Sequence, residues 1–324
     1  MAVSGSFDWH GRRVLLTGAS GFVGHHLVRA FEALGAEVHG VGFEAHAPSL
    51  PLAGWHVAEL RDTAALTAAV AAARPASIVH LAGQSSAARS FEDPEGTFAL
   101  NALGTWNLLR AVRDAAPASR TLVIGTSEVY GPQPEGTRVG EDAPFRPISP
   151  YGLSKAAADA FARVYAQDHG LDVVRTRSFS HTGPGQLPTF VAPSFAQQIA
   201  TIEAQRVEPV LRVGNLEVTR DLLDVRDVAR AYVALLERGA RGAAYNVCRG
   251  EGVRLTNLVE RLIARARVPI TVEIDPARLR PTDVPYLVGD PAAIERDTGW
   301  KARIALDQTL DDLLAEWRAR ASSG

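Results

Sequence analysis

The fold is decided by Val14-Leu15-Leu16-Thr17-Gly18-Ala19-Ser20-Gly21-Phe22-Val23-Gly24. The apolar beginning predicts a buried strand over residues 13–17, and the pattern that follows predicts a helix from about residue 21 to residue 34. Glycines in the turn between them allow the backbone to approach a pyrophosphate closely and the helix to pack tightly on the strand. The first turn of a helix adds free N–H donors and a partial positive charge. The stretch therefore predicts a dinucleotide-binding loop, which we favour over a glycine-rich turn without a ligand.

Strands and helices alternate along the chain outward from this loop. Strands are predicted over residues 36–41, 77–82, 120–126 and 172–177, and helices over residues 62–74, 94–116 and 154–168. This βαβα order is typical of a parallel sheet with helices on both faces. We therefore expect an α/β fold with a Rossmann-type, doubly wound parallel sheet.

The alternation breaks after residue 178, where prolines interrupt the pattern. A helix predicted over residues 225–238 and a strand over residues 243–247 then indicate a return to the first domain. We expect a dinucleotide-binding domain made of residues 1–178 plus about 224–250. A smaller, mainly C-terminal α/β lobe of residues 179–223 plus 251–324 would bind the substrate.

Composition limits the partners of the chain. Of its 324 residues 46% are hydrophobic, enough for a full core, and the formal net charge of -2 provides no global basic field for nucleic acid or an anionic membrane. Cys248 is the one cysteine, so an internal disulfide is excluded, which fits a reducing compartment. No apolar run is long enough to cross a bilayer, and no two histidines have the spacing of a zinc site. We expect a cytoplasmic protein without nucleic-acid, membrane or metal partners.

Three polar residues form a candidate catalytic set. Tyr151 and Lys155 stand four residues apart near the start of a predicted helix, which places the phenol and the ammonium on one face. A lysine charge and a nearby nicotinamide cation both favour the phenolate, so a phenol with an ordinary pKa of about 10 can exchange a proton near neutral pH. Thr126 ends a predicted strand, and a hydroxyl at the carboxyl end of a parallel strand faces the ligand crevice. The set therefore predicts ketone reduction or alcohol oxidation.

The end of the second predicted strand bears on the choice of coenzyme. An acidic residue at this place favours the free ribose hydroxyls of NAD. Here Gly42 occupies the expected place and Glu44 follows two residues later, which we interpret as a solvated loop charge. The missing acid favours NADP(H) over NAD(H). No arginine stands beside Gly42 to take a 2′-phosphate, so Arg12 and Arg13 are the candidate substitutes.

These motifs, in their order and separation, resemble those of the extended short-chain dehydrogenases/reductases. Later segments resemble more narrowly the GDP-4-dehydro-6-deoxy-D-mannose reductases: HLAGQSS at 80–86, HTGPGQ at 181–186, VGNLE at 213–217, RDLLDVRD at 220–227, DPARLRPTDVP at 275–285 and GD at 289–290. The likeness covers about residues 12–318. It also implies a homodimer, because the helices around 94–116 and 152–167 resemble those that pair subunits in this family.

The resemblance implies reduction of the C4 ketone of GDP-4-dehydro-6-deoxy-D-mannose to GDP-D-rhamnose with NAD(P)H. Tyr151 would protonate the new oxyanion, Lys155 would hold the ribose and lower the pKa of the phenol, and Thr126 would orient the ketone. The residues implied to bind the coenzyme are Gly18, Ser20, Gly21, Phe22, Val23, Gly24, Asp62, Leu81, Ala82, Gly83, Tyr151 and Lys155, with Asp62 at the adenine. The residues implied to face the substrate are Ser85, Ser127, Ser180, Arg220 and Arg280.

Two arginines are candidates for holding the two phosphates of a nucleotide sugar. Guanidinium forks suit phosphate oxygens, and Arg220 and Arg280 match arginines that grip the diphosphate in the family. Each stands near an acid, Asp221 or Asp283, so a structural ion pair is the alternative. We favour phosphate binding because a chain with a net charge of -2 must concentrate positive charge locally. Ser180 departs from the family, which usually has an asparagine that contacts the substrate phosphates.

Glu128 keeps other activities open. In sugar 4,6-dehydratases a glutamate two residues after the active-site threonine removes the C5 proton, and Thr126-Ser127-Glu128 has this spacing. The reductases also tend to carry this glutamate, so it does not decide between them. The alternatives are therefore a 4,6-dehydratase or a 4-epimerase and, in a different class, a non-catalytic dinucleotide-binding sensor. A sensor commonly loses the tyrosine or the lysine, and both are present here.

Overall fold

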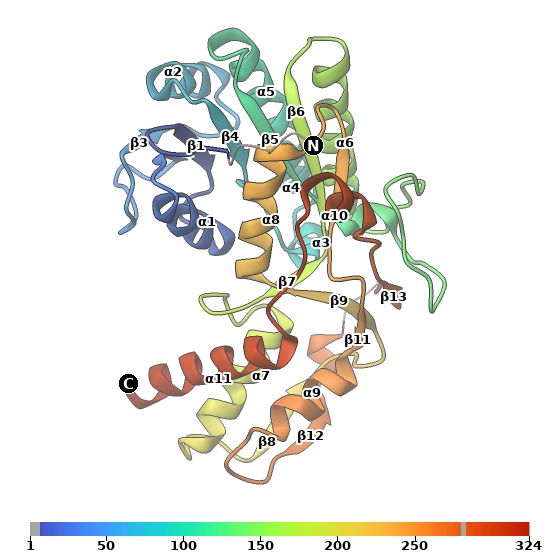
Figure 1. Ribbon diagram of the computed structural model, residues 1–324. Helices are drawn as coiled ribbons and strands as arrows, with labels where there is room; N and C mark the ends of the chain where they lie inside the picture. The colour runs from blue at the N-terminus through green and yellow to red at the C-terminus, as the bar shows by residue number, and fades with distance from the viewer. Residues whose placement is uncertain (1–6, 280–282, 324) are drawn as a thin grey trace.

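The computed structural model describes residues 7–279 and 283–323. A large domain holds most of the N-terminal half of the chain, and a smaller lobe, built largely from the C-terminal half, lies at one end of it (Figure 1). Helix α8 (Val225–Arg238) runs from the junction into the large domain, whereas helix α11 (Leu306–Ser323) belongs to the lobe (Figure 1).

A seven-stranded parallel sheet with the order β10-β6-β5-β4-β1-β2-β3 forms the centre of the large domain. Its strands are β1 (Arg13–Thr17), β2 (Glu37–Gly42), β3 (Gly54–Val57), β4 (Ser77–His80), β5 (Arg120–Thr126), β6 (Asp172–Ser178) and β10 (Ala244–Val247). The strand order reverses between β1 and β4, and ligands of such sheets bind outside the carboxyl ends at this point. The predicted Rossmann-type, doubly wound sheet is confirmed.

Successive side chains of β1 enter two different cores, because a strand points its residues alternately to opposite faces. Val14 and Leu16 pack among the buried residues of α1 (Phe22–Ala33) and α8. Leu15 lies among those of α2 (Thr63–Ala73), α5 (Gly104–Ala115) and α6 (Pro150–Gln167). Burial of both faces explains why this strand is a continuous apolar run rather than an alternating one.

The lobe has a hydrophobic core of its own. Helices α7 (Val191–Glu203), α9 (Leu255–Ile263) and α11 pack together beside the two-stranded sheet of β8 (Val210–Val213) and β12 (Thr271–Ile274). A four-stranded sheet lies at the junction of lobe and domain and consists of β7 (Ser180–Thr182), β9 (Thr219–Asp224), β11 (Gly252–Arg254) and β13 (Tyr286–Leu287) (Figure 1). A smaller α/β lobe, as predicted, is therefore present.

The predicted helices and strands are found with small shifts at their ends, and two differences are informative. The helix predicted over residues 94–116 contains a π-helical turn, so that α4 (Pro94–Phe98), η1 (Ala99–Leu103) and α5 follow one another. Strand β3 was not predicted. Shorter helices not predicted from the sequence are α3 (Ala87–Glu92), η2 (Ser127–Tyr130), η3 (Pro276–Arg278) and α10 (Ala292–Thr298). We keep the predicted domain boundaries as a proposal, supported by the place of β10 in the large sheet.

Candidate active site

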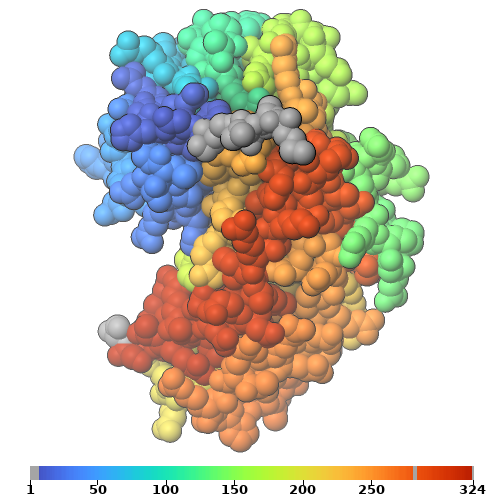
Figure 2. Space-filling model, in the orientation of Figure 1, coloured from blue at the N-terminus to red at the C-terminus, as the bar shows by residue number. Residues whose placement is uncertain are grey.

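A cleft of about 1890 Å³ extends along the carboxyl ends of the strands and between the domain and the lobe. The surface is hollowed between the N-terminal segment and α11 (Figure 2), and Glu316 and Arg320 of α11 belong to the lining. One wall consists of the loops after β1, β2, β4 and β5, and the other of residues from the junction and the lobe. Pockets for one small molecule measure roughly 300–1,000 Å³. The size of this cleft therefore suits a dinucleotide together with a second ligand.

The glycine loop between β1 and α1 is shaped for a pyrophosphate. Gly18 has a φ of +73°, and a Cβ there would lie 2.8 Å from the backbone nitrogen of Ala82, so only glycine fits. Gly21 precedes helix α1 and offers no side-chain cap, so the first amides of the helix are available to an anion. The six loop residues predicted to bind the coenzyme all line the cleft: Gly18, Ser20, Gly21, Phe22, Val23 and Gly24.

The loop after β4 forms the floor beside the glycine loop. Its predicted coenzyme contacts, Leu81, Ala82 and Gly83, line the cleft. His80 lies beneath them, fully buried, with Nδ1 2.8 Å from Thr17 Oγ1 and Nε2 3.0 Å from Thr105 Oγ1. Burial lowers the pKa of His80 to about 3, with a smaller effect from the charge of Lys155, so the ring is neutral. His80 therefore supports the floor instead of contacting a ligand.

The ends of β2 and β3 form the part of the cleft predicted to hold the adenosine. Asp62 precedes helix α2, and its carboxylate caps the helix by accepting from the amide of Ala65 at 2.9 Å. Its neighbours Leu60 and Arg61 line the cleft but Asp62 does not, and its contact with adenine stays a prediction.

Arg12 and Arg13 lie at the amino edge of the sheet, and Arg13 is 3.2 Å from Glu37. A five-residue strand, roughly 17 Å long, separates them from the carboxyl edge. Neither arginine reaches the 2′-position, so the interpretation of them as phosphate partners is wrong.

Thr126, Tyr151 and Lys155 meet where β5 ends and α6 begins. The side chains of Thr126 and Tyr151 share a hydrogen bond. The hydroxyl of Ser149 caps α6 by accepting from the amide of Gly152 at 3.0 Å, which fixes Tyr151 in the first helical turn. Lys155 lies one turn further on, and its Nζ donates to the carbonyl of Ile124 at 3.1 Å. The structure thus brings together the three residues that the sequence predicted to act together.

The protonation of these groups follows from their burial. Burial raises the pKa of Tyr151 above its ordinary value, the charge of Glu128 raises it further, and the hydrogen bond with Thr126 lowers it. Burial also lowers the pKa of Lys155 to about 8, which leaves an ammonium near neutral pH. Loss of hydration dominates here, and the lowering of the phenol pKa by Lys155 and a nicotinamide cation stays a prediction. A protonated phenol suits a group that gives its proton to a carbonyl oxygen.

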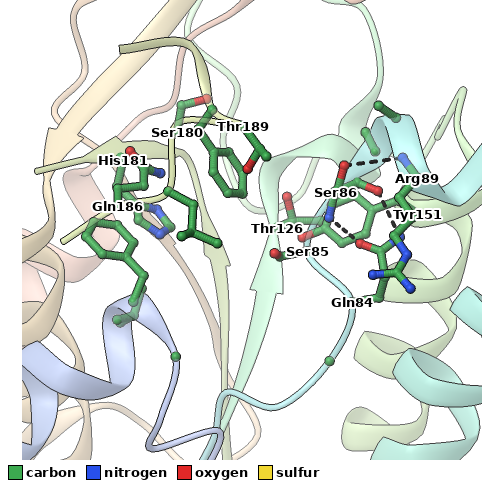
Figure 3. A pocket seen from close by; sticks show the side chains of 18 of the residues that line it. Gln84, Ser85, Ser86, Arg89, Thr126, Tyr151, Ser180, His181, Gln186 and Thr189 are labelled. Atoms are coloured by element: carbon green, nitrogen blue, oxygen red, sulfur yellow. Dashed lines mark hydrogen bonds between the residues drawn. The ribbon is translucent and has the colours of Figure 1, made fainter. Parts of the chain in front are cut away.

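The predicted substrate contacts Ser85 and Ser127 lie on the same wall as this catalytic set. Both line the cleft, Ser127 from the end of β5 and Ser85 from the loop after β4. Figure 3 shows Ser85 beside Thr126 and Tyr151. Glu128 also lines the cleft, and its Oε2 accepts a hydrogen bond from the Ser149 hydroxyl at 3.2 Å.

The opposite wall begins with Ser180, which lines the cleft as predicted and faces the catalytic set (Figure 3). The loop that follows is held from both sides of the junction. His26 of α1 has Nε2 2.9 Å from the carbonyl of Pro184, and the amide of Gly185 donates to Glu316 of α11 at 2.8 Å. The loop therefore ties the large domain to the lobe at the cleft.

Arg220 and Arg278 lie on the lobe side of the cleft, as does Arg320 of α11. Arg220 of β9 lines it with Nη2 2.7 Å from Asp283 Oδ1, so the ion pair considered as the alternative is present and a phosphate would share this guanidinium. Arg278 lines the cleft as well and is 3.3 Å from Asp275. We did not place Arg278 at the site from the sequence, and its position makes it a second candidate phosphate ligand. Arg280 lies outside the described residues.

Asn101 is a buried residue of the site that sequence reasoning missed. Its Oδ1 accepts from the amide of Gln84 at 2.8 Å, and its Nδ2 donates to the Gln84 carbonyl and the Ser154 hydroxyl, each at 3.0 Å. These bonds join the floor loop to helix α6, which carries Tyr151 and Lys155. Asn101 belongs to the π-helical turn, a feature frequent at functional sites. The one signal in the sequence is an asparagine in an otherwise apolar stretch.

Neither a metal centre nor a membrane span is found in the part of the chain that the structure describes. No group of three or more histidine, cysteine, aspartate or glutamate side chains is placed to hold a metal ion among residues 7–279 and 283–323. No helix within these ranges is long and apolar enough to cross a membrane.

Comparisons with known proteins agree with this geometry. The family model of GDP-mannose 4,6 dehydratase matches residues 15–313. GDP-6-deoxy-D-mannose reductase of Pseudomonas aeruginosa is 36% identical over 310 residues, covering 95% of this chain and 98% of that protein. GDP-mannose 4,6-dehydratase of Vibrio cholerae is 29% identical, with 94% and 93% covered. The structure of RMD from P. aeruginosa complexed with NADPH superposes with a TM-score of 0.82 at 34% identity, covering 95% and 99% of the two chains.

A dinucleotide fold in which a threonine, a tyrosine and a lysine meet at the strand ends defines an extended short-chain dehydrogenase/reductase. The protein is therefore an NAD(P)-dependent enzyme that acts on nucleotide sugars. Within this class, the chain belongs to the GDP-mannose 4,6 dehydratase family.

Proposed function

We propose that this enzyme reduces the C4 ketone of GDP-4-dehydro-6-deoxy-D-mannose and forms GDP-D-rhamnose. The observation that carries the proposal is the 36% identity with GDP-6-deoxy-D-mannose reductase over nearly all of both chains. The dehydratase of V. cholerae is less similar, at 29%.

The residues of the cleft have distinct tasks in this reaction. The glycine loop and the first turn of α1 hold the pyrophosphate of the coenzyme, which when bound supplies the hydride for C4. Tyr151 gives its phenolic proton to the oxygen at C4, and the Thr126 hydroxyl donates a hydrogen bond to the same oxygen. The ammonium of Lys155 stabilises the phenolate that Tyr151 leaves behind. Ser85, Ser127 and Ser180 orient the sugar, and Arg220 and Arg278 meet the diphosphate.

The position of Glu128 favours a second candidate, a nucleotide-sugar 4,6-dehydratase. Its carboxylate lines the cleft next to the catalytic set, where it would remove a proton from C5. A dehydratase keeps its coenzyme and returns the hydride, so it consumes no reduced nicotinamide. Stoichiometry therefore separates the two reactions.

To test this proposal, the purified protein is mixed with GDP-4-dehydro-6-deoxy-D-mannose and either NADH or NADPH. The absorbance of the reduced nicotinamide is then followed over time. We expect one coenzyme oxidised for each new GDP-sugar formed. GDP-mannose, supplied with NAD+ or NADP+ in place of the reduced coenzyme, is the matched control and should stay unchanged. Conversion of GDP-mannose to a keto sugar, with no oxidation of either coenzyme in the first reaction, would replace the reductase by the dehydratase.

We also propose that the enzyme is a homodimer that pairs through helices α5 and α6 and the π-helical turn before α5. Leu103 at the π-helical turn is 47% exposed and Leu153 of α6 is 55% exposed, although both are large apolar side chains. Helix α6, which carries Leu153, packs against the π-helical turn that carries Leu103. Light scattering after size exclusion should give twice the 34.6 kDa chain mass. The double variant Leu103→Glu and Leu153→Glu should run as a monomer, and a wild-type monomer would contradict the proposal.

The sequence predicts NADP(H) as the preferred coenzyme, and RMD from P. aeruginosa, a similar structure, was solved with NADPH. This preference is not supported by Arg12 or Arg13, which lie at the opposite edge of the sheet.

A further inference from the structure

The end of β2 adjoins the glycine loop and lines the cleft. Thr17 of β1 pairs with Val41 of β2, and the amide of Gly18 donates to the Val41 carbonyl at 3.3 Å. Val41, Gly42, Phe43 and Glu44 follow one another in the cleft wall. In dinucleotide folds an acidic side chain near this strand end accepts hydrogen bonds from the adenosine ribose hydroxyls. The side chains after Val41 therefore decide which ribose fits.

Gly42 leaves no room for the acid that such folds place at this strand end. A Cβ on Gly42 would lie 2.5 Å from the Trp55 ring, closer than real atoms approach. Trp55 belongs to β3, which pairs with β2, so its ring occupies this space as a consequence of the sheet. The missing acid is therefore a packing consequence of Trp55 and not by itself a sign of a phosphate-binding pocket.

Glu44 supplies a carboxylate at nearly the same place. Its Oε2 lies 3.0 Å from where the Cβ of Gly42 would be, so the side chain folds back over the strand end. The indole N–H of Trp55 donates to the backbone carbonyl of Glu44 at 2.9 Å, which fixes the residue above the ring. One tryptophan thus excludes a side chain at Gly42 and positions the carboxylate that replaces it.

The charges at this end of the cleft disfavour a 2′-phosphate. The charged side chains that line it at the ends of β2 and β3 are Glu44, Glu59 and Arg61. Arg61 Nη2 is 3.1 Å from Glu59 Oε2, so Glu59 balances the charge of this arginine. The formal charges of these two carboxylates and one guanidinium add up to a negative charge. A phosphate monoester carries about -1.5 to -2 charges at neutral pH and would face like charge.

We propose that Glu44 accepts hydrogen bonds from the hydroxyls of the adenosine ribose and makes NADH the preferred coenzyme of this enzyme. This reverses the preference expected from the sequence and sets the chain apart from RMD, which was solved with NADPH. Hydrogen bonds to charged groups correspond to about 10- to 100-fold in affinity, and repulsion of the 2′-phosphate adds to the difference. The proposal is independent of which sugar the enzyme reduces.

The test measures dissociation constants of NADH and NADPH by titration calorimetry with the full-length protein. We expect the wild type to bind NADH at least about tenfold more tightly than NADPH. Glu44→Gln keeps the size of the side chain and removes its charge, so NADH binding should weaken, NADPH binding should strengthen and the ratio should approach one. Glu37→Gln is the matched control, because it lies on the same strand at the opposite edge of the sheet.

Two results would overturn the proposal. One is a wild type that binds NADPH as tightly as NADH or more tightly. The other is a ratio that Glu44→Gln leaves unchanged while its thermal unfolding matches that of the wild type. Both results are dissociation constants of a coenzyme, so they can be interpreted whether or not the enzyme reduces the proposed sugar.

Discussion

Tyr151→Phe is expected to lower kcat by about 10²- to 10⁴-fold, the usual contribution of a positioned proton donor. The variant keeps the ring and loses only the hydroxyl that shares a hydrogen bond with Thr126. The oxygen at C4 then has no proton donor, while the glycine loop that holds the pyrophosphate is untouched. Coenzyme affinity should therefore stay close to that of the wild type. The measurement is single-turnover reduction of the GDP-sugar, combined with calorimetric titration of the coenzyme.

Tyr245→Phe is the matched control for this experiment. Tyr245 is also buried in the large domain and donates to Asp297 at 2.8 Å, but it is outside the cleft lining. Its replacement should leave kcat within about twofold, because it removes no group from the reaction. Unchanged turnover in Tyr151→Phe would remove this phenol from the mechanism, and an equal loss in both variants would point to a structural effect.

Asp159→Ala is expected to lower the free energy of unfolding by about 3–5 kcal/mol. Asp159 lies one turn after Lys155 on α6, is buried, and bonds both Arg175 and Arg177 of β6. Arg177 Nε is 3.3 Å from the carboxylate. Removing this carboxylate leaves two buried guanidinium groups without their anion. The resulting loss of folding free energy is larger than the net stabilisation by the ion pairs themselves. Urea unfolding followed by circular dichroism measures the change.

An exposed ion pair provides the comparison for Asp159. Asp114 lies 2.7 Å from Arg113 on the surface of the large domain, and Asp114→Ala should leave the unfolding midpoint unchanged, because water and salt screen the pair. Equal effects of the two substitutions would show that the buried network does not anchor α6. Loss of stability in Asp159→Ala alone would support its role in holding the helix that carries Tyr151 and Lys155.

The large sheet could be predicted from the sequence because its signals are local. The run of residues 14–16 is buried on both faces, and the glycines after it are required by the turn itself, as the φ of Gly18 shows. Tyr151 and Lys155 lie one helical turn apart, so their spacing alone places them on one face. Thr126 could be placed because it ends an apolar strand, and the carboxyl ends of parallel strands face the ligand crevice.

The remaining features depend on contacts between distant segments. Arg220 pairs with Asp283, and Asn101 joins two elements that are far apart in the sequence, so no local pattern reveals either role. Strand β3 is short and only partly buried, which leaves no apolar run to predict it from. Without β3, the ring of Trp55 could not be placed against Gly42, and Glu44 was interpreted as a solvated charge.

The most direct test of the central claim follows the hydrogen atom that is added to the sugar. The enzyme is given GDP-4-dehydro-6-deoxy-D-mannose and reduced coenzyme that carries deuterium at both positions of nicotinamide C4, and the product is analysed by mass spectrometry and NMR. The account predicts one deuterium for each product molecule, located at C4 of a GDP-linked deoxy sugar. A product without deuterium, or with deuterium at another carbon, would contradict it.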